Sequence, residues 1–393
     1  METVDKDTGE IHNRATKGKG SFWISRQAIE ILMSNPATAM DVCAYLVLAR
    51  HTDESGRYST AGMQAIYRGV GVGHKVAEGA AMRLSQMQAG KARRVGSGMV
   101  QALIYSAEAW EQKTSEALPH GPHERARVRW VLNDFDAGPE DRVWISNELI
   151  DGIGRFNQPL KRLKRCGDVA ARLLLACYEA NELEQFGGIK PSGAFAYNYE
   201  MSKMKQDIHG YDLWHGVAKN STVWGAARFL GVKKLPENED KKQEALAPLW
   251  AAINSLDSSG FVYQVVTVMD ADAGSNEAQV IYDLDTKSRH GYKPHGEHGL
   301  GGDTARISHH LGNPVADSTG RLYGRYAAIV PAGVQPHIVG IYRLRFRVAN
   351  PKNHGIKGAW ARIYNSQKEA QEWLEDIAGR EGIELSKVRH ENS

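Results

Sequence analysis

Two segments of the chain carry arginine at every second position. They are ERARVRWVL (124–132) and IYRLRFRVAN (341–350), and their arginines are Arg125, Arg127, Arg129, Arg343, Arg345 and Arg347. Because strand side chains alternate, each segment predicts a β-strand with one guanidinium face and one apolar face. Alternate residues lie about 7 Å apart, close to the spacing of successive phosphates, and Arg binds phosphate as a fork. The alternative is the solvated face of an edge strand, where charge prevents aggregation.

The composition is that of a soluble globular protein. The chain has 393 residues, a net charge of +3, 42% hydrophobic and 24% charged residues, which is enough for two or three domains. Its polar start has no apolar signal core and no run is long enough to span a membrane, so we expect a cytoplasmic protein with residues 1–20 disordered. The cysteines form no CxxC pair and are expected to be reduced packing residues.

The sequence contains a long internal repeat. FWISRQAIEIL (22–32) is echoed by VWISNELIDGI (143–153), and each copy precedes an apolar helix that opens with Asp-Val, at Asp41 and at Asp168. Both aspartates are placed as helix caps or first-turn acids. A repeat unit longer than about 100 residues indicates a duplicated domain rather than a solenoid.

The first copy predicts a helix-turn-helix followed by a hairpin. Residues 61–69 and 74–88 are expected to be helices joined by a turn that contains Gly71 and Gly73. The second helix is expected to bury Val76, Ala80, Leu84 and Met87 and to expose His74, Lys75, Glu78, Met82, Arg83 and Gln86. KARRV (91–95) and MVQALIYS (99–106) predict a β-hairpin with a basic first strand.

In this order of elements, residues 22–106 resemble a winged-helix DNA-binding domain. The duplication resembles the tandem winged-helix layout of plasmid and phage replication initiators and related regulators. The resemblance implies that helix 74–88 enters the major groove, with His74, Lys75 and Arg83 as contacts. The wing residues Lys91, Arg93 and Arg94 would then meet phosphate. Winged helices also serve as protein-interaction modules, and this alternative stays open.

The second copy differs from the first. A basic cluster precedes its long helix and is either a phosphate contact or a solvated face: Lys161, Arg162, Lys164 and Arg165. The helix that matches 74–88 is expected at 238–260, after an insertion at about 189–237 that we expect to be helical. The hairpin that follows, 261–269 with 278–284, has the acidic tip DADAGSNE, which phosphate would repel. The second copy is therefore expected to be a dimerisation or partner module.

Enzymatic chemistry finds less support. Residues 285–320 are rich in His and Gly but lack metal-ligand spacing, so no metal is expected. HGLGGDTARISHHLGN (298–313) and RLYGRY (321–326) resemble the C-terminal box of tyrosine recombinases, which implies Tyr323 or Tyr326 as nucleophile, with Gly301 where that family has Arg. A Walker loop and a dinucleotide fingerprint are missing from the sequence, so no cofactor is expected.

These patterns predict an α+β fold with two related winged helix-turn-helix domains and a basic, strand-containing C-terminal region. The expected layout is a disordered 1–20, a first winged helix at 21–110, a linker with an arginine strand at 111–140, a second winged helix at 141–284, a loop at 285–320, and a basic β region with a C-terminal helix at 321–393. The expected function is non-catalytic, sequence-specific binding of double-stranded DNA, as in an initiator or transcriptional regulator of a plasmid, phage or mobile element. A homo-oligomer is expected; an assembly protein and a recombinase are the alternatives.

Overall fold

The fold is known from a computed structural model of the 393-residue chain. It describes residues 3–4, 11–12, 20–119, 127–133, 138–152, 157–182, 188–190, 195–223, 230, 234–271, 278–287, 299–315, 325–346 and 356–385. The chain is mixed α+β and divides into two compact units. Unit 1 comprises residues 1–179, 225–261 and 346–350, and unit 2 comprises residues 180–224, 262–345 and 351–393. The expected six-part layout therefore gives way to two discontinuous units.

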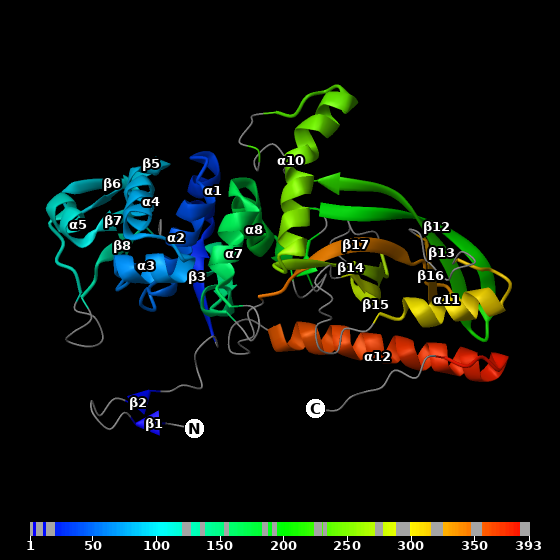
Figure 1. The fold of residues 1–393 in the computed structure, drawn as a ribbon. Helices are drawn as coiled ribbons and strands as arrows, with labels where there is room; N and C mark the ends of the chain where they lie inside the picture. Colours follow the sequence, from blue (N-terminus) through cyan, green and yellow to red (C-terminus); the bar gives the residue numbers. More distant parts are fainter. Residues whose placement is uncertain are drawn as a thin grey trace. The chain divides into compact units, whose positions relative to one another are not determined.

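Unit 1 opens with the elements of the first repeat (Figure 1). They are β3 (Ser21–Ser25), α1 (Arg26–Ser34), α2 (Ala39–Arg50), β4 (Tyr58–Ser59), α3 (Met63–Val70), α4 (His74–Gln86), β5 (Gln88–Val95), β6 (Gly98–Ala102), β7 (Ile104–Ser106), α5 (Ala107–Thr114) and β8 (Trp130–Leu132). The expected helices and the expected basic hairpin are thus confirmed as α3, α4 and β5–β6. Within residues 1–20, expected to be disordered, β1 (Thr3–Val4) pairs with β2 (Ile11–His12).

The second repeat completes the same unit. Its elements are the 3-10 turn η2 (Pro139–Asp141), β9 (Arg142–Ser146), α6 (Glu148–Asp151), α7 (Pro159–Cys166), α8 (Asp168–Glu179) and α10 (Glu239–Ser258). The repeated FWIS and VWIS strands pair with each other, antiparallel, so that Trp23 stands opposite Trp144. The two copies are therefore joined into one body by their own equivalent strands.

The helices of unit 1 begin where the sequence supplies caps. The Ser25 hydroxyl accepts from the amide of Ala28, and Thr38 and Asp41 form a capping box at the start of α2. Helix α2 is apolar around its whole circumference and is buried from Ala39 to Ala49, as expected of a central helix. Helix α3 ends at Gly71, whose φ of +68° is a left-handed conformation that glycine adopts without strain.

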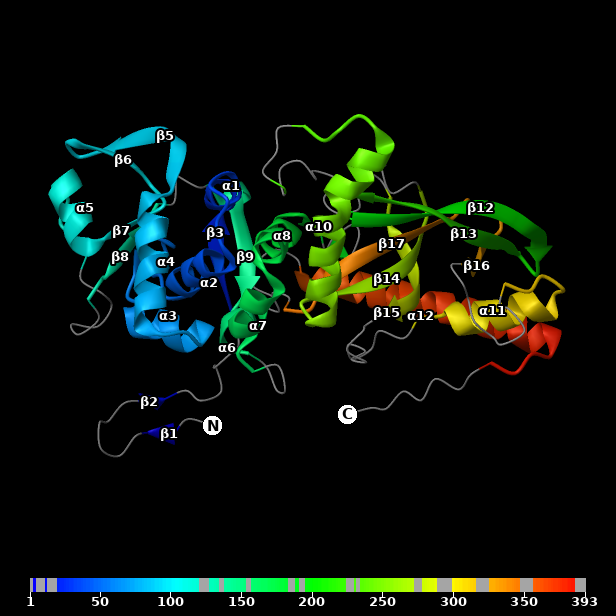
Figure 2. The same ribbon diagram turned by 45° about the horizontal axis from the view of Figure 1, so that its top comes forward.

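Unit 2 is built on a six-stranded sheet in the order β15-β14-β17-β12-β13-β16. These strands are β12 (Phe195–Ile208), β13 (Tyr211–Val223), β14 (Val262–Met269), β15 (Val280–Lys287), β16 (Arg325–Pro331) and β17 (His337–Leu344). All of its pairings are antiparallel. A short pair, β10 (Asn181–Glu182) and β11 (Gly188–Ile189), precedes it. Figure 2 shows β12 and β13 as a long ribbon within this sheet.

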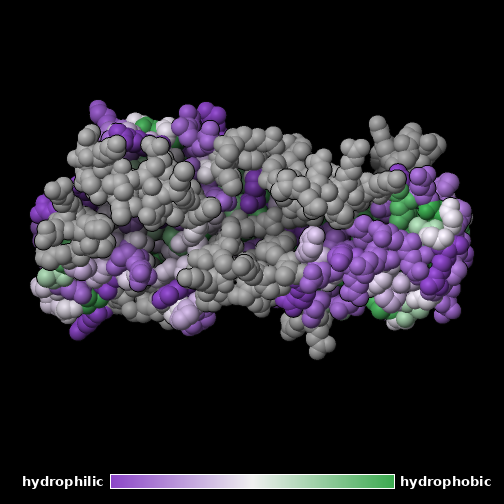
Figure 3. Space-filling model, turned by 90° about the horizontal axis from the view of Figure 1, so that it is seen from below, coloured by the Kyte–Doolittle hydropathy of each residue, from purple (hydrophilic) through white to green (hydrophobic). Residues whose placement is uncertain are grey.

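Two helices pack on the sheet. Helix α11 (Gly301–His310) lies on β16 and β15, and α12 (Ile356–Glu381) lies along β15 and α11. Helix α12 buries Ile363, Ala370, Leu374 and Ile377 at helical spacing and confirms the expected C-terminal helix. Seen from below, the side of unit 2 that α12 covers is mostly hydrophilic where it is described (Figure 3).

Three expectations about the second half of the chain are wrong. The insertion at 189–237 forms the strands β12 and β13 rather than helices in its described part, because Tyr197 and Tyr199 follow a period of two. The hairpin at 261–284 exists as β14–β15, but β14 pairs with β17 in unit 2 and is not a wing of a second winged helix. The expected loop at 285–320 contains α11.

Candidate nucleic-acid interface

Helix α4 exposes one side of its surface. It packs on α2 and α3 through Ala77, Ala80, Ala81 and Leu84, which are all buried. His74, Lys75 and Arg83, expected on the exposed face, are exposed. Val76, expected in the buried stripe, is instead 50% exposed, because Ala77 takes the buried position at that turn.

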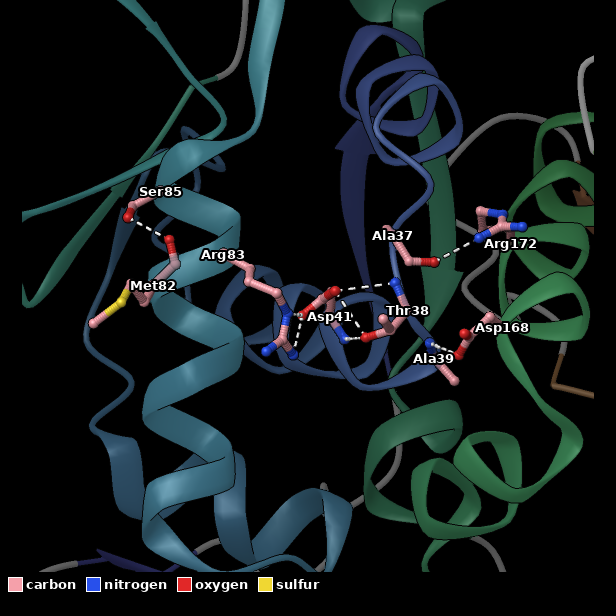
Figure 4. A network of polar contacts seen from close by, with 9 residues as sticks. All are labelled: Ala37, Thr38, Ala39, Asp41, Met82, Arg83, Ser85, Asp168 and Arg172. Carbon is pink, nitrogen blue, oxygen red and sulfur yellow. Dashed lines mark hydrogen bonds and ion pairs between the residues drawn. The ribbon is translucent and has the colours of Figure 1, made fainter. Parts of the chain in front are cut away.

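The start of α2 holds α4 in place (Figure 4). The carboxylate of Asp41 is 1% exposed and accepts from Nε and Nη2 of Arg83 at 2.9 and 2.7 Å. The same carboxylate accepts from the backbone and hydroxyl of Thr38 at 2.9 and 2.7 Å. Arg83 was expected to contact DNA; its guanidinium is engaged with Asp41, so its first role is to position α4.

The second repeat supports this network from the other side of α2. Oδ1 of Asp168 accepts from the amide of Ala39 at 2.7 Å, and Nη1 of Arg172 donates to the carbonyl of Ala37 at 2.8 Å. Burial lowers the pKa of Arg172, and Asp168 opposes that shift. Asp41 and Asp168 occupy equivalent repeat positions, but each serves the start of α2 (Figure 4). The second copy thus helps to fix the helix that carries α4.

The basic helix α7 lies beside the turn between α3 and α4. A side chain at Gly71 would meet Cδ of Lys161 at 2.9 Å, so the stem of Lys161 crosses the turn. Lys161, Arg162 and Lys164 are half-buried, and Arg165 is exposed. The structure therefore brings Lys161 of the expected cluster next to the start of α4.

The β5–β6 hairpin follows α4 and pairs Arg94 with Met99. Arg94 is exposed, whereas the side chains of Lys91 and Arg93 lie outside the described part of the structure. The turn packs on the end of α5, since a side chain at Gly96 would lie 2.1 Å from the Thr114 carbonyl oxygen. Arg94 is thus the described basic side chain of the expected wing.

The first arginine row is present in part. Arg127 and Arg129 are exposed in the extended segment before β8, and Val128 between them is half-buried. The Arg129 side chain lies 3.7 Å from the position of a side chain at Gly62, just before α3. Arg125 lies outside the described residues. Exposure alternates as expected at Arg127, Val128 and Arg129, but the described strand β8 begins only at Trp130.

The second arginine row is not a phosphate-binding face. Arg343 is 0% exposed and binds Asp283, so the expected DNA contact at Arg343 is wrong. Arg345 follows the end of β17 and its guanidinium lies over the ring of Tyr263, 5.9 Å from the centroid. Arg347 lies outside the described residues. The prediction of an exposed arginine face is wrong because β17 is a central strand with both faces buried, where polar groups need internal partners.

Of the two recombinase-like tyrosines, Tyr323 lies outside the described residues, and the hydroxyl of Tyr326 has a partner inside unit 2. Tyr326, one of the two recombinase-like tyrosines, is 1% exposed; its hydroxyl donates to Oδ2 of Asp285 at 3.1 Å, and burial raises its pKa. Nε2 of His215 lies 2.8 Å from the hydroxyl of buried Ser308, which itself bonds to the carbonyl of Asn313. Ser308 has one proton, which it gives to Asn313, so His215 donates rather than activates it.

Unit 2 contains no group of metal-ligating side chains among the residues that the structure describes. His309 and His310 are exposed at the end of α11, and His290, His295 and His298 lie outside the described part. No helix among the described residues is long and apolar enough to span a membrane.

Two residues of the candidate site were missed by the sequence analysis. The partner of Arg83, Asp41, was seen only as a cap, because nothing in the sequence links positions so far apart. Gly79 was not singled out. An isolated glycine inside a helical pattern lowers helix stability and therefore marks a position with a packing or functional reason. Comparison with protein-family models, with curated proteins and with solved structures finds no match for this chain.

Proposed function

We propose that unit 1 binds double-stranded DNA in a sequence-specific manner and without catalysis, as a replication initiator or transcriptional regulator of a plasmid, phage or mobile element does. The observation that carries the proposal is the order α3, glycine turn, α4 and hairpin β5–β6, which is the order of a winged helix. Helix α4 would enter the major groove, and the hairpin would flank it.

The charges around α4 support the same proposal. Lys75 lies on the outer face of α4, Lys161 crosses the turn before it, and Arg94 lies on the hairpin after it. Arg127 and Arg129 are exposed before β8, near the start of α3. Cations on four neighbouring segments suit a phosphate backbone, because each phosphate contact adds sequence-independent affinity.

The second copy is not expected to enter the groove. Its helix α10 packs on α8 as α4 packs on α2, but its first turn carries exposed Glu239 and Asp240 where α4 carries His74 and Lys75. Two carboxylates at that position would repel phosphate. We therefore assign DNA contact to the first copy and support of α2 to the second copy.

The test measures binding of the full chain to random-sequence duplex and to duplex from its own locus, between about 50 and 300 mM salt. The variant Lys75→Ala, Arg94→Ala, Lys161→Ala should reduce the log–log salt slope by about 1.8, since Arg94 and Lys161 flank α4 as phosphate contacts and each such contact contributes about 0.9. The matched control removes three exposed cations of unit 2: Lys219→Ala, Lys368→Ala, Arg380→Ala.

An unchanged slope in the control, with a reduced slope in the unit 1 variant, supports the proposal. Equal reductions of the salt slope in both variants would place the DNA contact outside the α4 region, and absence of binding at about 50 mM salt would overturn DNA binding.

A second candidate, an assembly protein that uses α4 for subunit contacts, is favoured by the exposed apolar side chains of Val76 and Met82. Self-association that Met82→Ala abolishes, without duplex binding, would support this candidate.

A further inference from the structure

Four residues form a stripe along α4, of which Lys75, Met82 and Gln86 are exposed and Gly79 is half-buried. Lys75, Gly79, Met82 and Gln86 recur at intervals of four, three and four, so they lie along one line of the helix surface. This line is opposite to the buried Ala77, Ala80, Ala81 and Leu84. Met82 is 63% exposed and lies on the side of α4 away from Asp41 (Figure 4).

Packing within the described part of unit 1 does not explain Gly79. A side chain there would meet only Nη1 of Arg83, at 3.5 Å, which is an ordinary van der Waals contact. A glycine inside a helix is less stable than alanine at the same place. The glycine therefore lowers helix stability and leaves a smooth surface in the middle of this stripe.

Together the four residues match the chemistry of a major groove. Lysine donates to the acceptors of guanine, glutamine pairs with the edge of adenine, and the apolar group that the groove offers is the C5-methyl of thymine. An exposed methionine between lysine and glutamine fits that methyl, and a glycine one turn earlier lets the helix backbone come close.

We propose that this stripe faces the base edges of the duplex, that Gly79 is the point of closest approach, and that Met82 packs on a thymine methyl. The inference rests on the proposed function and adds to it the base that Met82 reads. Cations favour DNA over an uncharged protein groove: Lys75 lies on the stripe, Lys161 at the turn and Arg94 on the hairpin. The acid on this face, Glu78, is paired with His74, with Oε1 and Nδ1 3.3 Å apart.

The first experiment selects bound sequences from random duplex with the full chain and then replaces each selected thymine by uracil, which removes only the methyl group. One replacement should weaken binding by about fourfold, the effect of losing one buried methyl. The Met82→Ala variant should bind the thymine site more weakly than wild type by a similar factor. It should bind the thymine site and the uracil site with equal affinity. Thymine and uracil sites that wild type binds equally would overturn the inference, as would a thymine effect that persists in Met82→Ala.

The second experiment compares Gly79→Ala with Gly379→Ala. Gly379 is exposed within α12 of unit 2, and a side chain there would meet nothing within 4 Å. Both substitutions should raise the melting temperature, because alanine favours helix. Only Gly79→Ala should weaken duplex binding, by about tenfold or more, since a methyl group would stand between helix and bases. Unchanged binding would overturn the role of Gly79.

The same experiments distinguish failure of the proposed function from failure of the inference about the α4 stripe. A chain that enriches no sequence from the random pool, or binds no duplex at low salt, does not bind DNA specifically at all. A chain that does select a sequence, yet is indifferent to uracil and to Gly79→Ala, binds DNA through another surface.

Discussion

Arg343 donates two hydrogen bonds to Asp283, from Nη1 to Oδ2 at 2.6 Å and from Nη2 to Oδ1 at 3.0 Å. The pair reaches from β17 across β14 to β15, and its side chains are 0% and 6% exposed. The backbone of Asp283 is held as well, since its amide donates to Oε1 of Gln367 at 2.7 Å and its carbonyl accepts from the amide of Leu300 at 2.9 Å. Asp283 therefore joins the sheet to α11 and α12, and Arg343 holds its carboxylate.

Arg343→Met should destabilise unit 2 by about 3–5 kcal/mol, because it leaves the buried carboxylate of Asp283 without its partner. The double variant Arg343→Met, Asp283→Leu should recover much of this loss, since both charges are then gone. Urea unfolding of the full chain measures both. A single variant as stable as wild type would contradict the structural role, and the duplex-binding salt slope of the double variant should match that of wild type.

Asp41→Ala should destabilise unit 1 by about 1–2 kcal/mol, because it removes the capping box of α2 and the partner of Arg83. Arg83→Ala should cost about 1 kcal/mol or less, since the arginine side chain is 46% exposed and solvent screens the pair. Both should weaken duplex binding, because α4 loses its anchor. The measurements are urea unfolding and binding at fixed salt; Arg83→Ala with full affinity would show that the anchor is dispensable.

Acidification should destabilise unit 2 through His215. Burial, the largest cause, lowers its pKa, and Arg325 lowers it further, whereas its hydrogen bond to Asn313 raises it. The unfolded chain, with a histidine pKa of about 6.5, therefore takes up the proton first. The stabilisation is present above about pH 6.5 and is lost as the pH falls toward the lower folded pKa.

Unfolding free energies between about pH 8 and 5 measure this dependence. His215→Gln keeps a donor for Ser308 but cannot take up a proton, so it should flatten the curve. His309→Gln, at an exposed position of α11, is the control. A curve for His215→Gln that matches wild type would show that another group causes the pH dependence.

Tyr326→Phe should leave any action on duplex DNA unchanged and should cost about 1 kcal/mol of stability, the value of one hydrogen bond. The hydroxyl lies inside unit 2 on Asp285 and its pKa is raised by burial, which opposes its use as a nucleophile. A cleavage assay with supercoiled DNA checks this. Cleavage by wild type that disappears in Tyr326→Phe would revive the recombinase alternative.

Local patterns of the sequence predicted local structure well. The expected helix at 74–88 is α4 at His74–Gln86, and the expected cap at Asp41 is part of a capping box. These features depend on neighbouring residues: a glycine turn, a side chain that bonds to the next amides, and apolar residues at helical spacing. Val76 was misplaced because one small residue, Ala77, decides which side of that turn is buried.

Long-range features could not be read from the sequence in the same way. The strand expected around Arg343 ends at Leu344, Asp283 lies 60 positions away, and β14 pairs with this strand, so burial of the arginine follows from tertiary pairing alone. The repeat predicted two similar domains. Instead, the long strands that follow α8 and α10 belong to the six-stranded sheet of unit 2. In the candidate site, Lys161 reaches the turn at Gly71 through packing of α7 that no local pattern encodes.

The pairing of β3 with β9 has a consequence for synthesis of the chain. A ribosome that has finished Ser25 must still make the residues up to Arg142 before the partner strand exists. At about 5–20 residues per second this interval lasts roughly 6–23 s. During it FWIS is an apolar strand with an open edge, the kind of segment that chaperones shield. A nascent chain that stalls after the hairpin would therefore carry α4 without the strand and helices of the second copy that support α2.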